Sequence, residues 1–292
     1  MLHAWGNAED QALQPLLKLA LAEDLGSVGD LTSNSVIPAE LVGQATLIAR
    51  TPGVLAGVPL IAQVCREIDP RLKVTPHFTD GQALIKGDRI ATITGPLRGL
   101  LSAERTILNF LQRLSGVASL TRQYVDAIKD YPCTVLDTRK TTPGWRVLEK
   151  FAVRCGGGRN HRMGLYDAVM IKDNHLAGLR HAGTPIATAI NQARAAIGPK
   201  VMLEVEVENL PQLAEALSAH PDIVLLDNMT LDLLKQSVQL RNQTAPNVRL
   251  EASGGVNLQT IRAIAATGVD CISVGALTHS APALDIALDY DE

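Results

Sequence analysis

The strongest constraint on the fold is an alternation of apolar runs and helix-like stretches in the second half of the chain. Short, continuous apolar runs are typical of strands that are buried on both faces of a parallel sheet. They lie at Thr134–Asp137, Ala168–Ile171, Val201–Val207, Asp222–Leu226, Val248–Ala252 and Asp270–Val274. Helix-like stretches separate them, at about 144–155, 183–196, 209–219, 230–241 and 257–267. This order predicts a parallel sheet covered by helices.

Polar and charged residues follow each apolar run, where the strand is expected to end. They are Thr138-Arg139-Lys140, Lys172-Asp173-Asn174, Glu204 with Glu206, Asp227-Asn228, Ser253-Gly254-Gly255 and Ser273-Val274-Gly275. Functional residues at the carboxyl ends of consecutive strands are typical of a β/α barrel. We therefore predict an α/β fold with an incomplete parallel barrel of six or seven strands. A doubly wound open sheet is the alternative.

The first 101 residues have a mixed pattern. Helices are expected at about 10–23 and at Pro59–Ile68, and strands at Gln44–Arg50, Leu72–Phe78 and Arg89–Thr94. This pattern predicts an α+β domain. A long helix should follow, capped by Ser102. Its apolar stripe is Ile107, Leu108, Leu111, Leu114 and Val117, and the opposite stripe is Arg105, Asn109, Gln112 and Arg113.

Composition excludes several classes of protein. The chain has 292 residues, a net charge of -3 and only 3% aromatic residues, which disfavours a nucleic-acid binder. Its four cysteines are scattered, as in reduced cytosolic proteins, rather than spaced for disulfides or zinc. We expect neither a signal peptide nor a membrane span, since no apolar run approaches about 20 residues. The expected location is the cytoplasm.

Positive charge is concentrated in residues 137–175. This segment holds eight Lys or Arg and four acidic residues, so it is +4 within a chain of -3, and the remainder must sum to -7. Such a concentration indicates an anionic small molecule or RNA, and the scarcity of aromatic residues disfavours stacking on single-stranded nucleic acid. Arg139 and Arg162 suit carboxylates, because a guanidinium can bind them through two parallel hydrogen bonds. Arg146, Lys150 and Arg154 fit a solvated helix face instead.

Glu204 and Asp227 are expected to lie at the ends of two successive strands. Two carboxylates facing a group of cations could hold Mg²⁺ that bridges phosphate oxygens. Alternatively, they are buried ion-pair partners of Lys140 and Lys172, and both descriptions can hold together. Glu206 shares a face with Glu204 but receives no role.

Small residues end the last two strands. Ser253-Gly254-Gly255 and Ser273-Val274-Gly275 could together offer backbone N–H groups to a phosphate, as barrels often do. The alternative is a pair of ordinary tight turns.

Several segments resemble the quinolinate phosphoribosyltransferase family. The resemblance covers about residue 20 to near the C-terminus and is most specific in the middle third. It rests on Ser102–Thr106, Asn109–Gly116, Asp137–Gly144, Gly156–Gly164, Ile171–His175, Glu204–Glu206, Leu226–Asn228, Glu251–Gly255 and Ser273–Gly275.

The resemblance implies an N-terminal α+β sandwich domain over residues 1–116 and a barrel domain over 117–276, with residues 277–292 packing back on the first domain. It implies a homodimer in which Arg105 reaches the partner's site. Quinolinate would contact Arg139, His161, Arg162 and Lys172, with Thr138 nearby. Lys140, Glu204 and Asp227 would bind phosphoribosyl pyrophosphate and its Mg²⁺, and Ser253, Gly254, Gly255, Ser273 and Gly275 its 5′-phosphate. Catalytic roles would fall to Lys140, Lys172, Glu204 and Asp227.

The implied activity is phosphoribosyl transfer to quinolinate with loss of CO₂, a step of NAD synthesis. Three alternatives stay open at this point. They are a molybdenum-associated relative of the same fold, a Schiff-base aldolase that uses Lys172, and a phosphosugar-binding protein without catalysis.

Overall fold

The computed structural model describes residues 4–181 and 183–290 and divides into two compact units. Unit 1 comprises Met1–Arg122, Thr141–Gly157 and Leu277–Glu292, and unit 2 comprises Gln123–Lys140 and Gly158–Ala276. Unit 1 therefore includes a stretch from the middle of the chain that the predicted boundaries assigned to the barrel. That stretch contains helix α5 (Arg146–Cys155).

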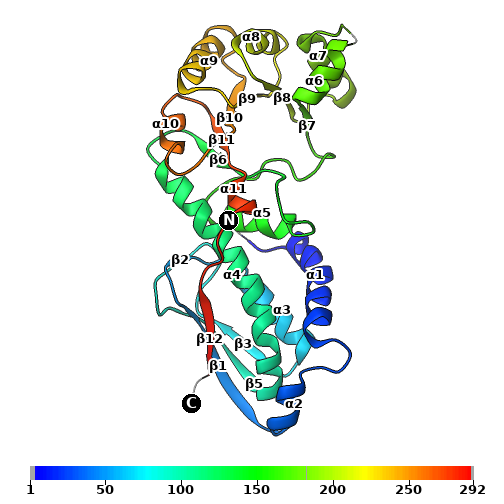
Figure 1. Ribbon diagram of the computed structural model, residues 1–292, viewed down its shortest axis with the longest axis vertical. Coiled ribbons are helices and arrows are strands. Elements are labelled where there is room, and N and C mark those ends of the chain that lie inside the picture. Colours follow the sequence, from blue (N-terminus) through cyan, green and yellow to red (C-terminus); the bar gives the residue numbers. More distant parts are fainter. Residues whose placement is uncertain (1–3, 182, 291–292) are drawn as a thin grey trace. The chain divides into compact units, whose positions relative to one another are not determined.

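Unit 1 is built on a four-stranded antiparallel sheet in the order β12-β1-β5-β3 (Figure 1). Its strands are β1 (Val42–Ala49), β3 (Lys73–Pro76), β5 (Arg89–Pro96) and β12 (Ile286–Tyr290), and a separate pair joins β2 (Gly53–Val54) to β4 (Ala83–Leu84). The three predicted strands are confirmed. The C-terminal segment returns to this unit as β12, in which Ile286 pairs with Ala49 of β1.

The helices of unit 1 are α1 (Asn7–Leu25), α2 (Leu31–Val36), α3 (Val58–Ile68), α4 (Leu97–Ala127) and α5, and α11 (Ala276–His279) follows the last strand of unit 2. The prediction that Ser102 caps the long helix is wrong, because α4 begins at Leu97. Pro96 precedes that residue, and a proline with no N–H is well placed where a helix starts. The Ser102 hydroxyl instead lies 2.9 Å from the Arg98 carbonyl oxygen, within the helix.

Part of the polar stripe of α4 has a structural role. Gln112 donates a hydrogen bond from Nε2 to the Ile286 carbonyl oxygen at 2.6 Å. Arg113 forms an ion pair with the fully buried Glu149 of α5 at 2.6 Å and also binds the Ala281 carbonyl. These two residues thus hold the returning C-terminal segment. Arg105 and Asn109 of the same stripe remain exposed.

The predicted solvated basic face of α5 is wrong. Lys150 is fully buried, and Arg154 forms an ion pair with Glu9 of α1 at 2.7 Å. Arg146 donates from Nε to the Thr141 hydroxyl at 3.1 Å. The helix packs against α1, so charges that look like a surface face in the sequence lie at a packing interface.

Unit 2 is built on a six-stranded parallel sheet in the order β6-β11-β10-β9-β8-β7. The strands are β6 (Thr134–Leu136), β7 (Val169–Ile171), β8 (Leu203–Val207), β9 (Ile223–Asp227), β10 (Arg249–Ser253) and β11 (Cys271–Ser273). From β7 to β11 the order follows the chain without reversal, which excludes a doubly wound sheet. β6 joins β11, as in a barrel that is open between β6 and β7.

One further contact lies at this opening. Arg159 forms an isolated parallel bridge with Leu136 of β6, with its N–H bonded to the Val135 carbonyl at 2.9 Å. A seventh strand would occupy that position. The predicted incomplete barrel is confirmed, with six strands in the described part of the chain and a single bridge beside β6.

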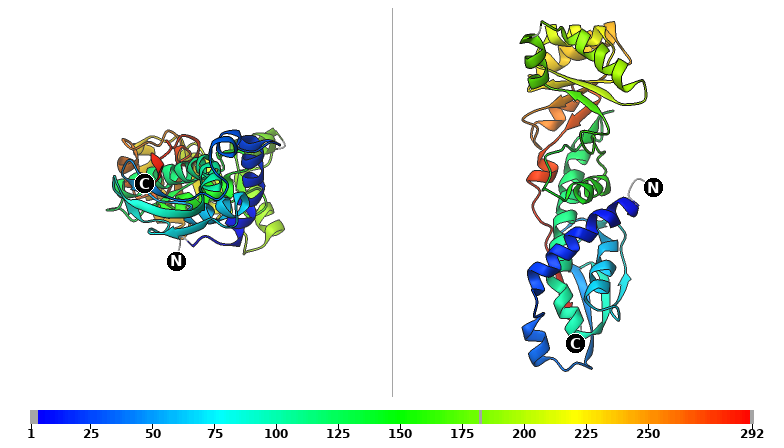
Figure 2. Two further views of the ribbon diagram at one scale, coloured as in Figure 1. Left: turned by 90° about the horizontal axis from the view of Figure 1, so that it is seen from below. Right: turned by 90° about the vertical axis from the view of Figure 1, so that its right-hand side faces the viewer.

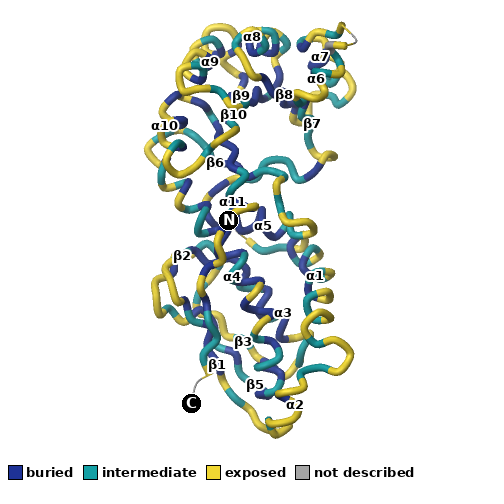
Figure 3. Tube along the Cα trace, viewed as in Figure 1, coloured by how far each residue is buried: buried dark blue, intermediate teal, exposed yellow. Residues whose placement is uncertain are grey.

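Helices alternate with these strands: α6 (Asp173–His181), α7 (Ile186–Ile197), α8 (Leu210–Ser218), α9 (Leu231–Thr244) and α10 (Ile261–Ala265). The yellow and gold helices α8 and α9 lie together on the outer side of the strands (Figure 1 and Figure 2), and Figure 3 shows the trace at β8 and β9 as buried. Every residue of β8 is buried, including its two glutamates, Glu204 and Glu206. Within the described residues, no helix is both long and apolar enough to cross a bilayer.

Candidate active site

The strand register places the predicted site residues at different depths. Glu204 is the second residue of β8 and pairs with Ile223, whereas Asp227 is the last residue of β9 and pairs with Ser253. Glu204 therefore lies four residues deeper than Asp227, roughly 13 Å along the strand direction at about 3.3 Å per residue. The view that both carboxylates end their strands is wrong for Glu204, which is 2% exposed.

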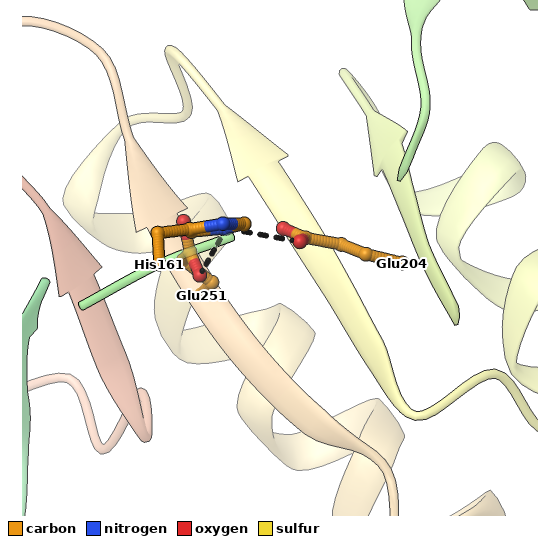
Figure 4. A group of neighbouring side chains, drawn as sticks. All are labelled: His161, Glu204 and Glu251. Atoms are coloured by element: carbon orange, nitrogen blue, oxygen red, sulfur yellow. Dashed lines mark ion pairs between the residues drawn. The ribbon is translucent and has the colours of Figure 1, made fainter. Parts of the chain in front are cut away.

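Glu204 belongs to a buried cluster with two other side chains, His161 and Glu251. His161 Nε2 lies 3.0 Å from Glu204 Oε2 and 3.5 Å from Glu251 Oε2. Figure 4 shows the two carboxylates reaching this ring from β8 and β10. Glu204 Oε1 and both oxygens of Glu251 are buried without a hydrogen bond. Two carboxylates thus face a single imidazole.

Protonation of this cluster follows from its hydrogen bonds. Burial lowers the pKa of His161, but the neighbouring carboxylates of Glu204 and Glu251 outweigh burial and raise it to about 10. Burial, opposed by His161 and reinforced by Glu251, raises the pKa of Glu204. The Arg162 main-chain N–H points at His161 Nδ1 across 2.7 Å, and Nε2 faces the two carboxylates. Contacts at both ring nitrogens therefore fix the orientation of the imidazole.

Asp137, the residue after β6, fixes the segment that carries His161. Its fully buried carboxylate accepts hydrogen bonds from the His161 N–H at 2.8 Å and from Asn160 Nδ2 at 2.6 Å. The segment beyond it is held by Asp167, which accepts from the Met163 and Gly164 N–H groups. His161 and Arg162 are thereby positioned by two carboxylates rather than by a helix or strand.

Cations gather near this cluster. Burial and then repulsion from Arg139 lower the pKa of Arg162. Arg162 donates to the Ala168 carbonyl at 3.1 Å. Lys172 Nζ forms an ion pair with Glu206 Oε2 at 3.0 Å, although 44% of the lysine side chain is exposed. Glu206 thus gains a role, and Lys172 pairs with it rather than with Glu204 or Asp227.

The rim of the sheet carries Asp227 and the glycine turn. Asn228 Nδ2 donates to Asp227 Oδ2 at 2.7 Å, and the Asn228 N–H donates to the Ser253 carbonyl at 2.9 Å. Gly254 and Gly255 have φ of +95° and +62°, values that side-chain-bearing residues rarely adopt. No atom lies within 4 Å of the position that a Cβ of Gly255 would take, so the backbone there is open to a ligand.

The other predicted residues lie as follows. Ser273 ends β11, and Gly275 follows it; the preceding residue of β11, Ile272, pairs with Ala252, next to Ser253. Thr138 follows β6, and its hydroxyl accepts the Lys140 N–H at 3.0 Å. Arg105 lies on α4 in unit 1, 60% exposed, with Glu104 at 3.9 Å.

Two residues of this region, Glu251 and Asp137, received no role in the sequence prediction, and Asn228 was placed at the end of its strand but also without a role. Glu251 lies two residues before Ser253 on the same strand face, so alternation along β10 was a signal for it. Asp137 was visible as the residue before the basic Thr138–Lys140 group. The left-handed φ of Asn228, +51°, had no signal beyond the known tolerance of asparagine for it.

Comparison with known proteins decides the family. A sequence profile described as the C-terminal domain of quinolinate phosphoribosyl transferase matches residues 117–289, and its N-terminal counterpart matches residues 30–115. The chain belongs to the quinolinate phosphoribosyltransferase family.

Similar proteins span nearly the full length of this family member. A probable nicotinate-nucleotide pyrophosphorylase (carboxylating) from Bacillus subtilis is 45% identical, over 95% of this chain and 93% of that protein. The nicotinate-nucleotide pyrophosphorylase from Mycobacterium leprae is 42% identical, over 97% and 99% of the two chains. The structure of NadC from Streptococcus pyogenes superposes with a TM-score of 0.91 at 41% identity, covering 99% of this chain and all of that one.

Proposed function

We propose that this enzyme transfers the phosphoribosyl group of phosphoribosyl pyrophosphate to quinolinate, releasing pyrophosphate and CO₂ and forming nicotinate mononucleotide. The observation that carries the proposal is the placement of Arg162, whose main-chain N–H lies 2.7 Å from His161 of the buried cluster, within a unit that also bears a glycine turn open at Gly255. One feature suits a dicarboxylate and the other a phosphate. The family match supports the same reaction.

Quinolinate would be held by charge-assisted hydrogen bonds to its two carboxylates. Arg139 and Arg162 would supply the guanidinium donors, and Lys172 a further positive charge, with Thr138 nearby. His161 would act indirectly, rather than by contacting quinolinate as the family resemblance implies. Both of its ring nitrogens face protein atoms, Arg162 N–H and the Glu204–Glu251 pair, so its main role would be to position Arg162.

Phosphoribosyl pyrophosphate would lie across the rim. Ser253, Gly254, Gly255, Ser273 and Gly275 would bind its 5′-phosphate, and Lys140 its pyrophosphate. Mg²⁺ would be held by Asp227 at the rim, together with the water molecules that Mg²⁺ usually retains. Glu204 lies roughly 13 Å deeper along the strands, too far to bind the same ion, and its role would be to hold His161. When bound, Mg²⁺ would neutralise the departing pyrophosphate.

The chemistry needs positioning more than a protein nucleophile. As pyrophosphate departs, the ribose becomes oxocarbenium-like, and the quinolinate nitrogen attacks its C1. N-ribosylation makes the pyridine ring cationic. Loss of CO₂ from the adjacent carbon then leaves an electron pair beside the positive nitrogen, which stabilises it. The residues of this chain would orient the ring and exclude water during these steps.

A homodimer would complete the site, with Arg105 contributed by the partner subunit. Unit 1 exposes Arg105, and it also exposes about two thirds of the surface of Leu31, Val36 and Val42. Such apolar exposure suits burial against a second copy of the chain. The four free cysteines suit the reducing cytoplasm as the location.

The test is turnover with quinolinate, compared with nicotinate. Nicotinate lacks the second carboxylate, and loss of a charge-assisted partner should cost about 1.5–3 kcal/mol, or roughly 10–150-fold in kcat/KM. The assay should require Mg²⁺ and stop in excess chelator. Equal use of nicotinate would refute the dicarboxylate clamp, and full activity in chelator would refute the role of Mg²⁺.

A further inference from the structure

Asn228 connects two parts of the rim that the proposed function assigns to different ends of one substrate. Its side-chain amide donates to Asp227 Oδ2 at 2.7 Å, and its main-chain N–H donates to the Ser253 carbonyl at 2.9 Å. The first contact holds a carboxylate of β9, and the second holds the start of the glycine turn after β10. Because Asp227 and Ser253 are also register partners, the three residues form one hydrogen-bonded edge.

The backbone of Asn228 is shaped for this position. Its φ of +51° lies in the left-handed region, which asparagine tolerates better than most residues. The Asn228 side chain also explains the glycine at position 254. A Cβ on Gly254 would lie 2.1 Å from Asn228 Oδ1 and 2.6 Å from its Cγ. Asn228 and Gly254 are therefore a matched pair, in which the amide occupies the space that a side chain would need.

We propose that Asn228 is a positioning residue that sets the spacing between the pyrophosphate-binding and 5′-phosphate-binding parts of the site. This inference rests on the proposed function. Phosphoribosyl pyrophosphate is anionic at both ends, and the ribose fixes the separation of those ends. An amide that orients Asp227 while its backbone holds Ser253 keeps the two binding parts in register. Quinolinate recognition, which involves Arg139 and Arg162, does not pass through Asn228.

The first experiment uses the variant Asn228→Gly, which keeps the left-handed backbone accessible and removes only the amide. Binding of phosphoribosyl pyrophosphate with Mg²⁺ is measured by isothermal titration calorimetry, and KM is measured for both substrates. We expect Kd and KM for phosphoribosyl pyrophosphate to rise roughly 10–150-fold, because a hydrogen bond to a charged group is lost. The Kd and KM for quinolinate should change less than twofold.

Asn209→Gly is the matched control. Asn209 follows the neighbouring strand β8, and its side chain caps α8 by accepting the Gln212 N–H at 3.0 Å. That variant should lose some thermal stability but bind phosphoribosyl pyrophosphate normally. Unchanged binding by Asn228→Gly, or equal weakening by Asn209→Gly, would overturn the inference.

A double-mutant cycle with Gly254→Ala gives an independent result. The added methyl must displace the Asn228 amide, so Gly254→Ala should itself break the contact with Asp227. Asn228→Gly should then cause no further loss, within twofold, in the Gly254→Ala background, whereas additive losses would contradict the coupling. Failure of the proposed function is distinguishable, because wild type would then neither bind nor consume phosphoribosyl pyrophosphate.

Discussion

Replacing Glu251 by glutamine should make the protein more stable and less active. Glu251 is fully buried, neither of its carboxylate oxygens has a hydrogen bond, and its nearest cation is His161 Nε2 at 3.5 Å. The same imidazole lies closer to Glu204, at 3.0 Å, so two buried carboxyl groups share one imidazole. Repulsion between the carboxylates contributes to the raised pKa of Glu204.

The magnitude follows from the cost of burying an unsatisfied polar group, about 1–3 kcal/mol. Glutamine removes the charge, and its amide can donate to Glu204 Oε1, which has no partner. The free energy of unfolding at pH 8 should therefore rise by about 1–3 kcal/mol, and the melting temperature by about 2–4 °C for each kcal/mol. Product formation should fall, because His161 loses one of the two groups that hold its ring. Such opposition of stability and activity is common at functional sites.

The assay is denaturant unfolding monitored by circular dichroism, together with turnover of quinolinate. Glu206→Gln is the matched control in the same unit. Glu206 has a partner, Lys172, and because that lysine is 44% exposed the pair contributes no more than about 1 kcal/mol. Glu206→Gln should therefore be neutral or slightly destabilising. A decrease in stability for Glu251→Gln would refute the reasoning.

Three further predictions concern other parts of the protein. Burial raises the pKa of Asp80 to about 6 against hydrogen bonds from two main-chain N–H groups. Its folded pKa exceeds the unfolded value, so about 1–3 kcal/mol of stability present below pH 4 should be lost as pH rises through 6. Asp80→Asn should remove that slope in pH-dependent denaturation, and an unchanged slope would contradict it. Asp227→Asn should raise KM for phosphoribosyl pyrophosphate at least tenfold while metal-free quinolinate binding, measured by calorimetry, stays within twofold; equal loss of both would argue against its role. Mixing Arg105→Ala with Lys172→Ala chains should restore about half of wild-type activity per heterodimer, whereas no recovery would mean that Arg105 serves its own chain.

Much of the barrel could be predicted because its strands are short apolar runs buried on both faces. The six runs correspond to β6 to β11 within a few residues at each end. Helix α6 was missed because Asp173–His181 contains three His or Asp residues and little apolar periodicity. The strand β12 was also missed, since a C-terminal strand beside β1 depends on pairing between distant segments.

The sequence shows the positive charge of residues 137–175 but not which of these side chains belong to the site. Residues 137–175 are basic in the sequence, but Lys150 and Arg154 lie within the packing of unit 1, and only part of the charge belongs to the site. Local spacing cannot distinguish these cases, because α5 leaves the barrel sequence and packs against α1.

The contacts between charged side chains of the site could not be predicted from the sequence either. Glu204 and Asp227 look equivalent as acids in successive strands, but the register sets them four residues apart in depth. Consequently Glu204 meets His161, and Lys172 meets Glu206. Such partners depend on strand stagger, which residue types alone do not specify.

The central claim is tested most directly by following the two carboxylates of quinolinate separately. Quinolinate labelled with ¹³C in the carboxylate next to the ring nitrogen is incubated with phosphoribosyl pyrophosphate, Mg²⁺ and the enzyme. We expect labelled CO₂, unlabelled nicotinate mononucleotide and pyrophosphate in equal amounts, with the label retained in the nucleotide when the other carboxylate carries it. Retention of the first label in a nucleotide product, or the absence of any nucleotide, would contradict the account.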